Sequence, residues 1–394
     1  MNHKAVILGA NYYIGLSVIR GLGRNNIPVV AVDYQEEGTY GFHSKYVSEK
    51  LIAPHYRKNT KEYIQFLIDY AKSQDHKPVL FPCADPYVEV VDAHLDELKK
   101  YYLINQEKQG LFTDLMDKNT LHDIALEHGV KVPETIRIDE EDFLVKVQKL
   151  AGYPCIVKPS DSPAFVDVFR KKMFKVHNVS ELEEAIKKAK EHQLEVFVQR
   201  IIPGFDDHMY TFDCYLNQNS KVTHYMTCNK NRQYPINFGA SVYTKQLHVP
   251  ELYTIGAPFL EAVGFKGFAE IEFKKDAETG EYYLIEINVR TTNLNALLEK
   301  VGLNFPYIAY RELIGQPTEN QFIEYSTHRT FVYAFEDVLA IKGYLKTKQL
   351  TGWSVFKSLF RKKAYAIWAL DDTKPYFNYM GQLFSKVIKK LKRK

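Results

Sequence analysis

The chain has 394 residues, of which 45% are hydrophobic and 25% are charged, and its formal net charge is +4. This length exceeds one ordinary hydrophobic core and predicts two or three domains, and the composition is that of a folded globular protein. The small net charge gives no support to nucleic-acid binding as a function.

Cysteine spacing and apolar runs bear on the location of the protein. The cysteines show no C-x-x-C spacing, so we expect reduced thiols rather than a zinc site or a disulfide framework. The sequence enters an apolar segment at residues 5–8 without the regions of a signal peptide, and it has no apolar run of about 18 residues. We therefore expect a cytoplasmic protein.

Strand and helix patterns alternate over residues 1–115. Predicted strands at 4–10, 27–33 and 78–85 are each followed by helical periodicity, which is typical of a parallel, Rossmann-like α/β sheet. The first turn, GANYYIG, lacks the G-x-G-x-x-G spacing of a dinucleotide site. Asp33 ends the second strand and is read as a turn residue rather than a ribose ligand.

Beyond this segment the pattern changes to shorter strands and hairpins. A helix at 117–129 is followed by an apolar strand that ends on Lys158 and by a glycine-free polar stretch at 160–172, which we expect to be a loop. Another apolar strand at 194–202 leads into a Pro-Gly turn, and residues 267–290 read as a hairpin.

This last hairpin carries polar side chains where a buried strand is expected. Its first strand holds Glu270 and Glu272, and its second holds Glu286, Asn288 and Arg290. Alternate residues of a strand share one face, so pairing can place Glu272 beside Glu286. Close carboxylates repel unless a proton or a cation bridges them, and an all-oxygen set suits Mg²⁺. The hairpin alone leaves two readings open, a magnesium site or exposed carboxylates with Arg290 as a surface partner.

Two lysines upstream favour the magnesium reading. Lys158 ends a buried strand and Lys118 begins an earlier helix, and each could point its charge at a phosphate. Taken alone, each is more readily explained as a solvated lysine. Together with the carboxylates they indicate a nucleotide–magnesium site, to which the strand at 194–202 could offer backbone groups for a purine edge.

The order of these motifs resembles the ATP-grasp superfamily. DKNTLHDIALEHGVKVPET, YPCIVKPSD, VFVQRIIPG, and EIEF followed by YLIEINVR stand in the family's order. The resemblance implies ATP and Mg²⁺ as cofactors and an α/β fold, α+β in the grasp domains. It also implies these divisions: a Rossmann-like domain at 1–115, grasp domains at 116–325 with a lid at about 150–205, and a C-terminal extension at 326–394.

The resemblance assigns roles to residues of the site. Glu272, Glu286 and Asn288 would be Mg²⁺ ligands. The ATP contacts would come from several elements: Lys118 and Lys158 at the phosphates, Gln199, Arg200, Ile201 and Ile202 at the adenine, and Asp207 near the ribose.

Two positions depart from the family pattern. Arg200 stands where an acidic residue is common, so only its backbone could bind adenine. The stretch 160–172 has no glycine to cover phosphates with backbone amides, and a basic side chain such as Lys172 would take their place. The second departure concerns closure over ATP rather than ATP use.

Within the superfamily, residues 78–135 are similar in pattern to bacterial D-aspartate ligases and related carboxylate–amine ligases of cell-wall synthesis. Such enzymes phosphorylate a carboxylate and let an amine attack the acyl phosphate, so small carboxylates and amines are the expected partners, and dimers are common among them. Arg290 would bind the carboxylate or acyl phosphate through its planar fork. Lys230 and Arg232 would hold the acidic substrate or phosphate, or else are loop charges in water.

Two alternatives to this function stay open. The chain could be an ATP-grasp ligase that makes a small peptide or a modified metabolite, or a catalytically inactive nucleotide-binding scaffold. The glycine-free stretch favours the scaffold, whereas the intact set of Glu272, Glu286, Asn288 and Arg290 speaks against it.

Residues 379–394 predict a basic amphipathic helix. Lysines and an arginine fill one face, and apolar residues at spacings of three and four fill the other: Met380, Leu383, Phe384, Val387, Ile388 and Leu391. Such a helix can lie on an anionic membrane, at the cytoplasmic leaflet, or dock by its apolar face on the protein body. We favour the membrane slightly, because a cell-wall precursor would lie near it.

Overall fold

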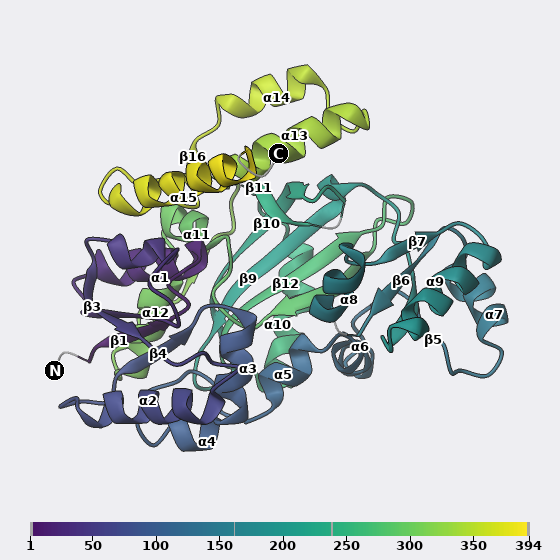
Figure 1. The fold of residues 1–394 in the computed structure, drawn as a ribbon. Coiled ribbons are helices and arrows are strands. Elements are labelled where there is room, and N and C mark those ends of the chain that lie inside the picture. Colours follow the sequence, from purple (N-terminus) through teal and green to yellow (C-terminus); the bar gives the residue numbers. More distant parts are fainter. Residues whose placement is uncertain (1–2, 161, 238, 392–394) are drawn as a thin grey trace.

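The computed structural model describes residues 3–160, 162–237 and 239–391. A parallel sheet of order β3-β2-β1-β4 lies at the N-terminal end (Figure 1), with buried apolar strands between helices on both faces. Asp33 is the last residue of β2, and its carboxylate accepts the backbone amides of Asn11 and Tyr34, both at 2.9 Å. The elements are β1 (Ala5–Leu8), α1 (Tyr13–Gly23), β2 (Val29–Asp33), η1 (Tyr40–His43), β3 (Val47–Ile52), α2 (Thr60–Lys72), β4 (Val79–Pro82), α3 (Asp85–Ala93) and α4 (Leu95–Leu98).

A larger, mostly antiparallel sheet forms the centre of the molecule, in the order β13-β12-β9-β10-β11-β15-β16, with β14 beside β10. Its strands are β9 (Met209–Leu216), β10 (Val222–Tyr234), β11 (Ala240–Gln246), β12 (Gly267–Lys275), β13 (Tyr282–Asn288), β14 (Gln321–Phe322), β15 (Thr330–Val332) and β16 (Lys363–Tyr365). The 3-10 turn η3 (Asp206–His208) leads into β9, and the helices α5 (Leu111–Met116), α6 (Lys118–Glu127) and α10 (Pro250–Ala262) share an apolar cluster with one face of the sheet.

The hairpin of β12 and β13 forms in the register that the sequence pattern predicted. Glu272 lies opposite Glu286, and Glu270 lies opposite Asn288. Ile287 points to the other face and joins the apolar cluster under α10. The hairpin therefore has one apolar face and one polar face, as period-two alternation requires.

A third, small sheet of order β5-β8-β6-β7 stands apart at the right of Figure 1. It contains β5 (Thr135–Arg137), α7 (Phe143–Lys146), η2 (Val147–Ala151), β6 (Cys155–Pro159), β7 (Phe174–Val176), α9 (Val179–Glu191) and β8 (Val196–Arg200). The expected loop at 160–172 is wrong in one respect, because much of it is helix α8 (Ser162–Phe169). Phe165 and Phe169 are one helical turn apart and both pack on Phe174, with ring centroids 5.0 and 4.9 Å away, which explains the helix.

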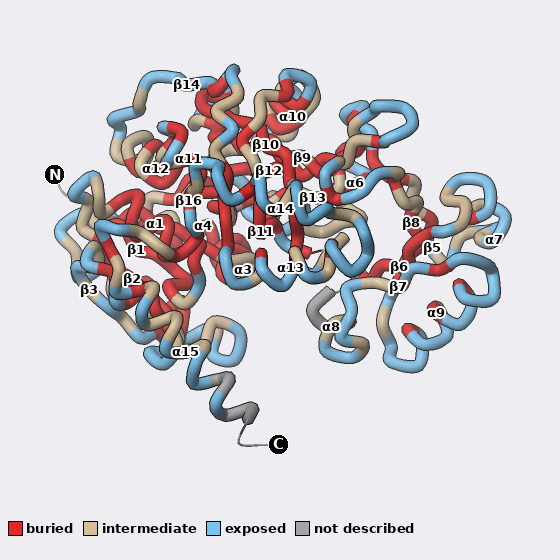
Figure 2. Tube along the Cα trace, turned by 90° about the horizontal axis from the view of Figure 1, so that it is seen from above, coloured by how far each residue is buried: buried red, intermediate tan, exposed pale blue. Residues whose placement is uncertain are grey.

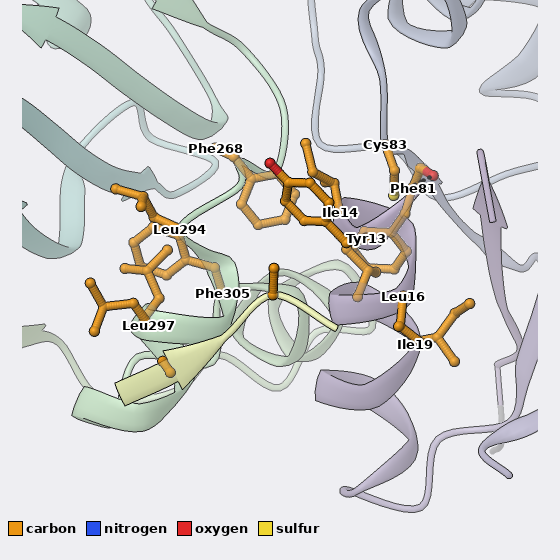
Figure 3. Close-up of a cluster of buried hydrophobic side chains, with 14 of the residues drawn as sticks. Tyr13, Ile14, Leu16, Ile19, Phe81, Cys83, Phe268, Leu294, Leu297 and Phe305 are labelled. Carbon is orange, nitrogen blue, oxygen red and sulfur yellow. Dashed lines mark hydrogen bonds between the residues drawn. The ribbon is translucent and has the colours of Figure 1, made fainter. Parts of the chain in front are cut away.

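Residues after 326 do not form a separate unit. β15 and β16 extend the central sheet, and one apolar cluster joins α1 and β4 to the central sheet and to helices near the C-terminus (Figure 3). Figure 2 shows this buried region as continuous between the N-terminal and central sheets. The helices of this half are α11 (Asn295–Val301), α12 (Phe305–Leu313), α13 (Ala334–Lys346), α14 (Gly352–Leu359) and α15 (Lys374–Leu391).

Helix α15 lies over the N-terminal domain (Figure 1), where Tyr376 and Tyr379 pack on the main apolar cluster and Tyr379 meets η1; this supports the docked reading for its first turns. Tyr379 packs on Tyr40 with ring centroids 5.5 Å apart, and its hydroxyl lies 2.9 Å from that of Tyr333. Further along, Phe384 is 63% exposed and Ile388 is 51% exposed. The side chains of Val387 and Leu391 lie outside the described residues. Among the residues that are described, no helix has the length and apolar character needed to cross a bilayer.

A buried ion pair holds the segment before α15 to α1. The Arg20 guanidinium donates to the Asp372 carboxylate at 2.9 Å, to the Asp372 carbonyl and to the Ile367 carbonyl. Ser44 and the Lys45 amide donate to the same carboxylate. The side chains of Arg20 and Asp372 are only 5% and 1% exposed, so neither charge has water as an alternative partner.

Asp372→Ala should destabilise the fold strongly, because it leaves the Arg20 charge buried and without its carboxylate. Removing one partner of a buried pair costs about 3–5 kcal/mol. Urea unfolding measures this loss. Asp371→Ala is the control: its carboxylate accepts two hydrogen bonds from Arg24 and one from the Tyr46 hydroxyl, but it is 42% exposed, so water can replace the lost partners and the loss of stability should be smaller. Equal losses in the two variants would contradict this account.

Candidate active site

The polar face of the β12–β13 hairpin is the centre of the candidate site. Glu270, Glu272, Glu286 and Asn288 all point to it, as the register requires. The Asn288 amide nitrogen donates to Glu270 at 3.0 Å, which leaves the amide oxygen as an acceptor beside the carboxylates. Glu272 is 8% exposed, and burial raises the pKa of its carboxyl, although the nearby Lys230 charge opposes this shift.

Lys230 reaches this face from the neighbouring part of the sheet. Its ammonium lies 2.6 Å from Glu272, and both side chains are buried. Burial acts to lower the pKa of Lys230, but the negative charges of Glu272, Glu270 and Glu286 outweigh it and raise the pKa. The structure thus places Lys230 inside the carboxylate cluster rather than in a solvated loop.

Three further lysines come close to Glu286. Burial acts to raise the pKa of this carboxyl, yet the pKa is lowered by the positive charges of Lys118, Lys230, Lys172 and Lys158. These lysines belong to α6, β10, the segment after α8, and β6. The predicted phosphate lysines and the predicted metal ligands therefore converge on one place.

Lys158 is the most buried of the predicted phosphate lysines. Its ammonium donates to Gln199 at 2.7 Å, and the Gln199 amide donates in turn to Thr135 at 3.0 Å. Burial, reinforced by the Lys118 charge, lowers the pKa of Lys158 to about 7. The Gln199 side chain therefore positions Lys158, a role that the sequence interpretation missed when it assigned Gln199 to adenine.

The predicted adenine segment begins at the end of β8, in the small sheet of order β5-β8-β6-β7. The Arg200 guanidinium is bound by Glu134 and Asp276, and its backbone amide donates to the Glu134 carbonyl at 2.9 Å. Its side chain is thus held by two ion pairs, and adenine binding by the backbone at this position stays a prediction. Ile202 is buried and Ile201 half-buried.

The segment after this strand is held by a lysine that the sequence reading did not select. Lys274 of β12 donates to the carbonyls of Gly204 and Phe205 at 2.8 and 2.6 Å. Burial lowers the pKa of Lys274 to about 8. Asp207, the predicted ribose residue, follows directly and has a side chain that is 62% exposed and hydrogen-bonded to His208.

Arg232 does not lie beside Lys230. The prediction that both side chains hold the same substrate or phosphate is therefore wrong for Arg232. A bulge at Asn231 shifts the pairing of β10, so Lys230 lies opposite Thr244 but Arg232 lies opposite Tyr243, on the other face of the sheet. There Arg232 forms two bonds of 2.6 and 2.7 Å to Asp337 and stacks on the Tyr243 ring at 3.6 Å. Its fork is filled by a side chain of α13.

Arg290 lies on the same side as Glu286, as predicted, and is half-buried beside Asp85 at the end of the N-terminal sheet. Its Nε atom donates to Asp85 at 2.5 Å, and one terminal nitrogen donates to the Thr291 carbonyl. Asp85 is the first residue of α3 and its side chain is 46% exposed. Asp85 therefore orients Arg290. The one indication of this role in the sequence is that Asp85 follows an apolar strand.

A further acidic pair, Asp213 and Glu270, is buried next to the predicted metal ligands. Asp213 of β9 lies opposite Glu270, and Thr211 donates to Asp213 at 2.7 Å. Burial raises the pKa of Glu270 to about 8 and that of Asp213 to about 6. The sequence reading did not assign Asp213, although an acidic residue inside the apolar stretch FDCYL was a usable signal.

The Lys158→Met variant tests the burial of this charge. The pKa of Lys158 is lowered in the folded protein, so between about pH 7 and the ordinary lysine pKa near 10.4 the unfolded chain binds more protons. Wild-type stability should therefore rise across this window relative to the Met variant, by about 2–3 kcal/mol between pH 7 and pH 10. Urea unfolding of both proteins measures the difference, and Lys190→Met on the exposed side of α9 is the control. A difference that does not change with pH would contradict the burial of the charge.

Comparisons with known proteins place this geometry in a family context. A family model described as the D-Ala–D-Ala ligase C-terminus matches residues 126–293. The D-aspartate ligase of Enterococcus faecium (strain Aus0004) is 27% identical over 258 residues. That alignment covers 61% of this chain and 61% of the ligase, so the chain spans less than two thirds of this relative's length.

Solved structures show the fold. The biotin carboxylase domain of the Hydrogenobacter thermophilus 2-oxoglutarate carboxylase, crystallised as a dimer with MgADP, matches with a TM-score of 0.66 and 16% identity, over 83% of this chain and 73% of that one. The L-amino acid ligase of Bacillus licheniformis matches with a TM-score of 0.60 and 16% identity, over 81% and 76%. The prediction from the motifs is confirmed: the chain has the ATP-grasp fold and resembles the D-Ala–D-Ala ligase C-terminus over residues 126–293.

Proposed function

We propose that this protein is an ATP-dependent carboxylate–amine ligase that forms a C–N bond and releases ADP and phosphate. The observation that carries the proposal is the convergence of the positive charges of Lys118, Lys158, Lys172 and Lys230 on the half-buried carboxylate of Glu286. Such a concentration of positive charge around buried acidic groups suits a polyanion held together with a metal ion.

The residues of the hairpin fit Mg²⁺. Glu272 and Glu286 face each other from paired strands. The Asn288 side chain bonds Glu270 through its nitrogen, so its oxygen remains available as a ligand. Carboxylate and amide oxygens are the ligand types that Mg²⁺ prefers, together with phosphate oxygens. Bound there, Mg²⁺ would neutralise charge on the phosphoryl group in transfer.

The lysines and the lid sheet supply the ATP site in this proposal. Lys118, Lys158 and Lys172 would contact the phosphates, and the Lys158 charge would be restored by the polyanion next to it. The backbone of residues 199–202 would bind the adenine, and Asp207 would lie near the ribose. Gln199 serves by holding Lys158 in place.

The reaction takes two steps. A carboxylate oxygen of the first substrate attacks the γ-phosphorus of ATP, the bond to the bridging oxygen breaks, and ADP leaves with an acyl phosphate formed. The amine then attacks the acyl carbon, loses a proton, and expels phosphate as the amide forms. Buried lysines and Arg290 stabilise the negative charge that develops in both steps.

Arg290 would bind the substrate carboxylate or the acyl phosphate in this scheme. Its Nε atom donates to Asp85. Burial acts to lower the pKa of Arg290, but the negative charge of Asp85, followed by those of Glu270 and Glu286, outweighs burial and raises the pKa. Likeness to D-aspartate ligase favours an amino-acid carboxylate, with D-aspartate as first candidate and cell-wall precursor synthesis in the cytoplasm as the setting. Likeness to L-amino acid ligase favours small-peptide synthesis as the second candidate. A homodimer is the assembly we propose, by analogy with the dimeric neighbour.

A substrate screen tests the ligase activity. D- and L-amino acids are offered pairwise with amines in the presence of MgATP, and ADP and phosphate release are measured. We expect release that requires both partners, with ¹⁸O passing from a labelled carboxylate into phosphate because an acyl phosphate forms. ATP binding without amine-dependent release in any pair would favour the scaffold instead.

Glu286→Gln tests the metal side of the site. It removes one charge from the carboxylate pair, and we expect the ADP release rate to fall by about 100-fold or more, with the fold unchanged, as is common for a lost transition-state interaction. Glu281→Gln on the same hairpin is the matched control, since its carboxylate is 44% exposed and pairs with Lys131 outside the site. Similar activity in both variants would contradict the assignment of Glu286.

Arg290→Lys separates carboxylate binding from ATP binding. The lysine keeps the charge but loses the planar fork, so the KM for the carboxylate should rise by about 10- to 100-fold while the KM for ATP changes little. Steady-state kinetics with each substrate varied in turn give both constants. An equal rise in both would place Arg290 at the nucleotide instead.

A further inference from the structure

Helix α14 presents an apolar surface to solvent. Trp353 is 63% exposed, Phe356 47%, Leu359 61% and Phe360 75%. These residues follow one another at spacings of one to four, and the rings touch: Trp353 stacks on Phe356 at 5.5 Å, and Phe356 meets Phe360 at 5.1 Å. We call these four residues the α14 surface.

This exposure is not the result of a poorly formed helix. Thr351 and Ser354 form a reciprocal capping box at its N-terminus, which stabilises the first turn. Ser358 is its one buried residue among those described. The helix stands at the outer edge of the molecule, at the top of Figure 1, so its apolar side chains lie away from the core.

The chain around α14 is strongly basic. Residues 338–370 contain seven Lys and Arg residues and no Asp or Glu. Lys357, Arg361 and Lys362 are exposed beside the α14 surface, and the Lys357 ammonium lies 5.3 Å from the Trp353 ring. An aromatic surface bordered by cations is complementary to a lipid interface with anionic headgroups.

Helix α13, which precedes α14 and carries Glu336 and Asp337 in its first turn, also exposes apolar side chains. Its inner face packs on the central sheet through Ala340 and Tyr344, which belong to the main apolar cluster. Its outer face leaves Phe335 49% exposed and Val338 66% exposed. Two consecutive helices thus turn apolar side chains outward, whereas scattered single exposures are ordinary on a protein surface.

We propose that the α14 surface docks this protein on an anionic lipid bilayer, with the aromatic side chains at the headgroup level and Lys357, Arg361 and Lys362 on the phosphates. Charge selects this occupant, since an acid-free basic stretch would repel the same stretch of a second copy. This proposal assigns the membrane contact to α14 instead of α15, because the first turns of α15 pack on η1 of the N-terminal domain. The inference does not depend on the proposed ligase activity.

Vesicle binding by the full chain tests this inference. We use vesicles of phosphatidylcholine alone and of phosphatidylcholine mixed equally with phosphatidylglycerol, and measure the bound fraction by flotation. We expect binding to the anionic vesicles only, weakened by salt. In a Trp368→Phe background, Trp353 fluorescence should shift to the blue and be quenched by brominated lipid. The absence of binding to either vesicle would overturn the proposal.

Two triple variants locate the contact. Phe356→Ala with Leu359→Ala and Phe360→Ala should reduce vesicle binding at least tenfold without altering the thermal midpoint, because these side chains are exposed. The matched control is Phe377→Ala with Phe384→Ala and Ile388→Ala on α15, which removes side chains of similar exposure. Loss of binding only in the α15 variant would overturn the proposal, as would a dimer in solution that the α14 variant converts to monomer while vesicle binding persists.

Charge reversal completes the test. Lys357→Glu with Arg361→Glu and Lys362→Glu should abolish the preference for anionic vesicles. Lys187→Glu with Lys188→Glu and Lys190→Glu makes the same change of charge on the exposed face of α9 and should leave the preference in place. Equal effects of the two variants would mean that net charge alone drives binding and would overturn the assignment to α14.

Discussion

The packing of acidic side chains and lysines on the polar face of the β12–β13 hairpin is the constraint on which this site depends. A carboxylate partly withdrawn from water, as Glu286 is, is costly unless opposite charge lies near it, and here that charge comes from Lys118, Lys158, Lys172 and Lys230, which lie in four separate parts of the chain. The lysines in turn repel one another, which contributes to the lowered pKa of Lys158. A divalent cation would neutralise the carboxylates, and a polyphosphate chain would reduce the repulsion between the lysines. The charge arrangement is therefore complementary to a polyphosphate bound with a divalent cation.

The C-terminal segment gives the site its support. Asp372 pairs with Arg20 of α1, and Asp337 pairs with Arg232 of β10, so acidic residues of the last third of the chain bind arginines of both the N-terminal and the central sheets. The same segment leaves its outer helix α14 with apolar and basic side chains in solvent. One side of the segment thus serves the fold, and the other is available for a lipid surface.

Period-two alternation was enough to predict which residues of the β12–β13 hairpin share a face, because a strand leaves no other choice. The ATP-grasp order of motifs likewise predicted the fold. The direction of the Arg232 side chain could not be predicted from the sequence, because it depends on a bulge in the pairing of β10 with β11. Its partner Asp337 lies 105 positions away in the chain. The role of Gln199 needed the structure as well, because its contact with Lys158 joins two strands of the lid sheet.

A crystal structure with Mn²⁺ and a non-hydrolysable ATP analogue tests the central claim most directly. The account predicts an anomalous Mn²⁺ signal between Glu272 and Glu286, with the Asn288 oxygen as a further ligand and the ammonium groups of Lys118 and Lys158 on phosphate oxygens. A nucleotide bound elsewhere, or a metal ion that avoids both carboxylates, would contradict it.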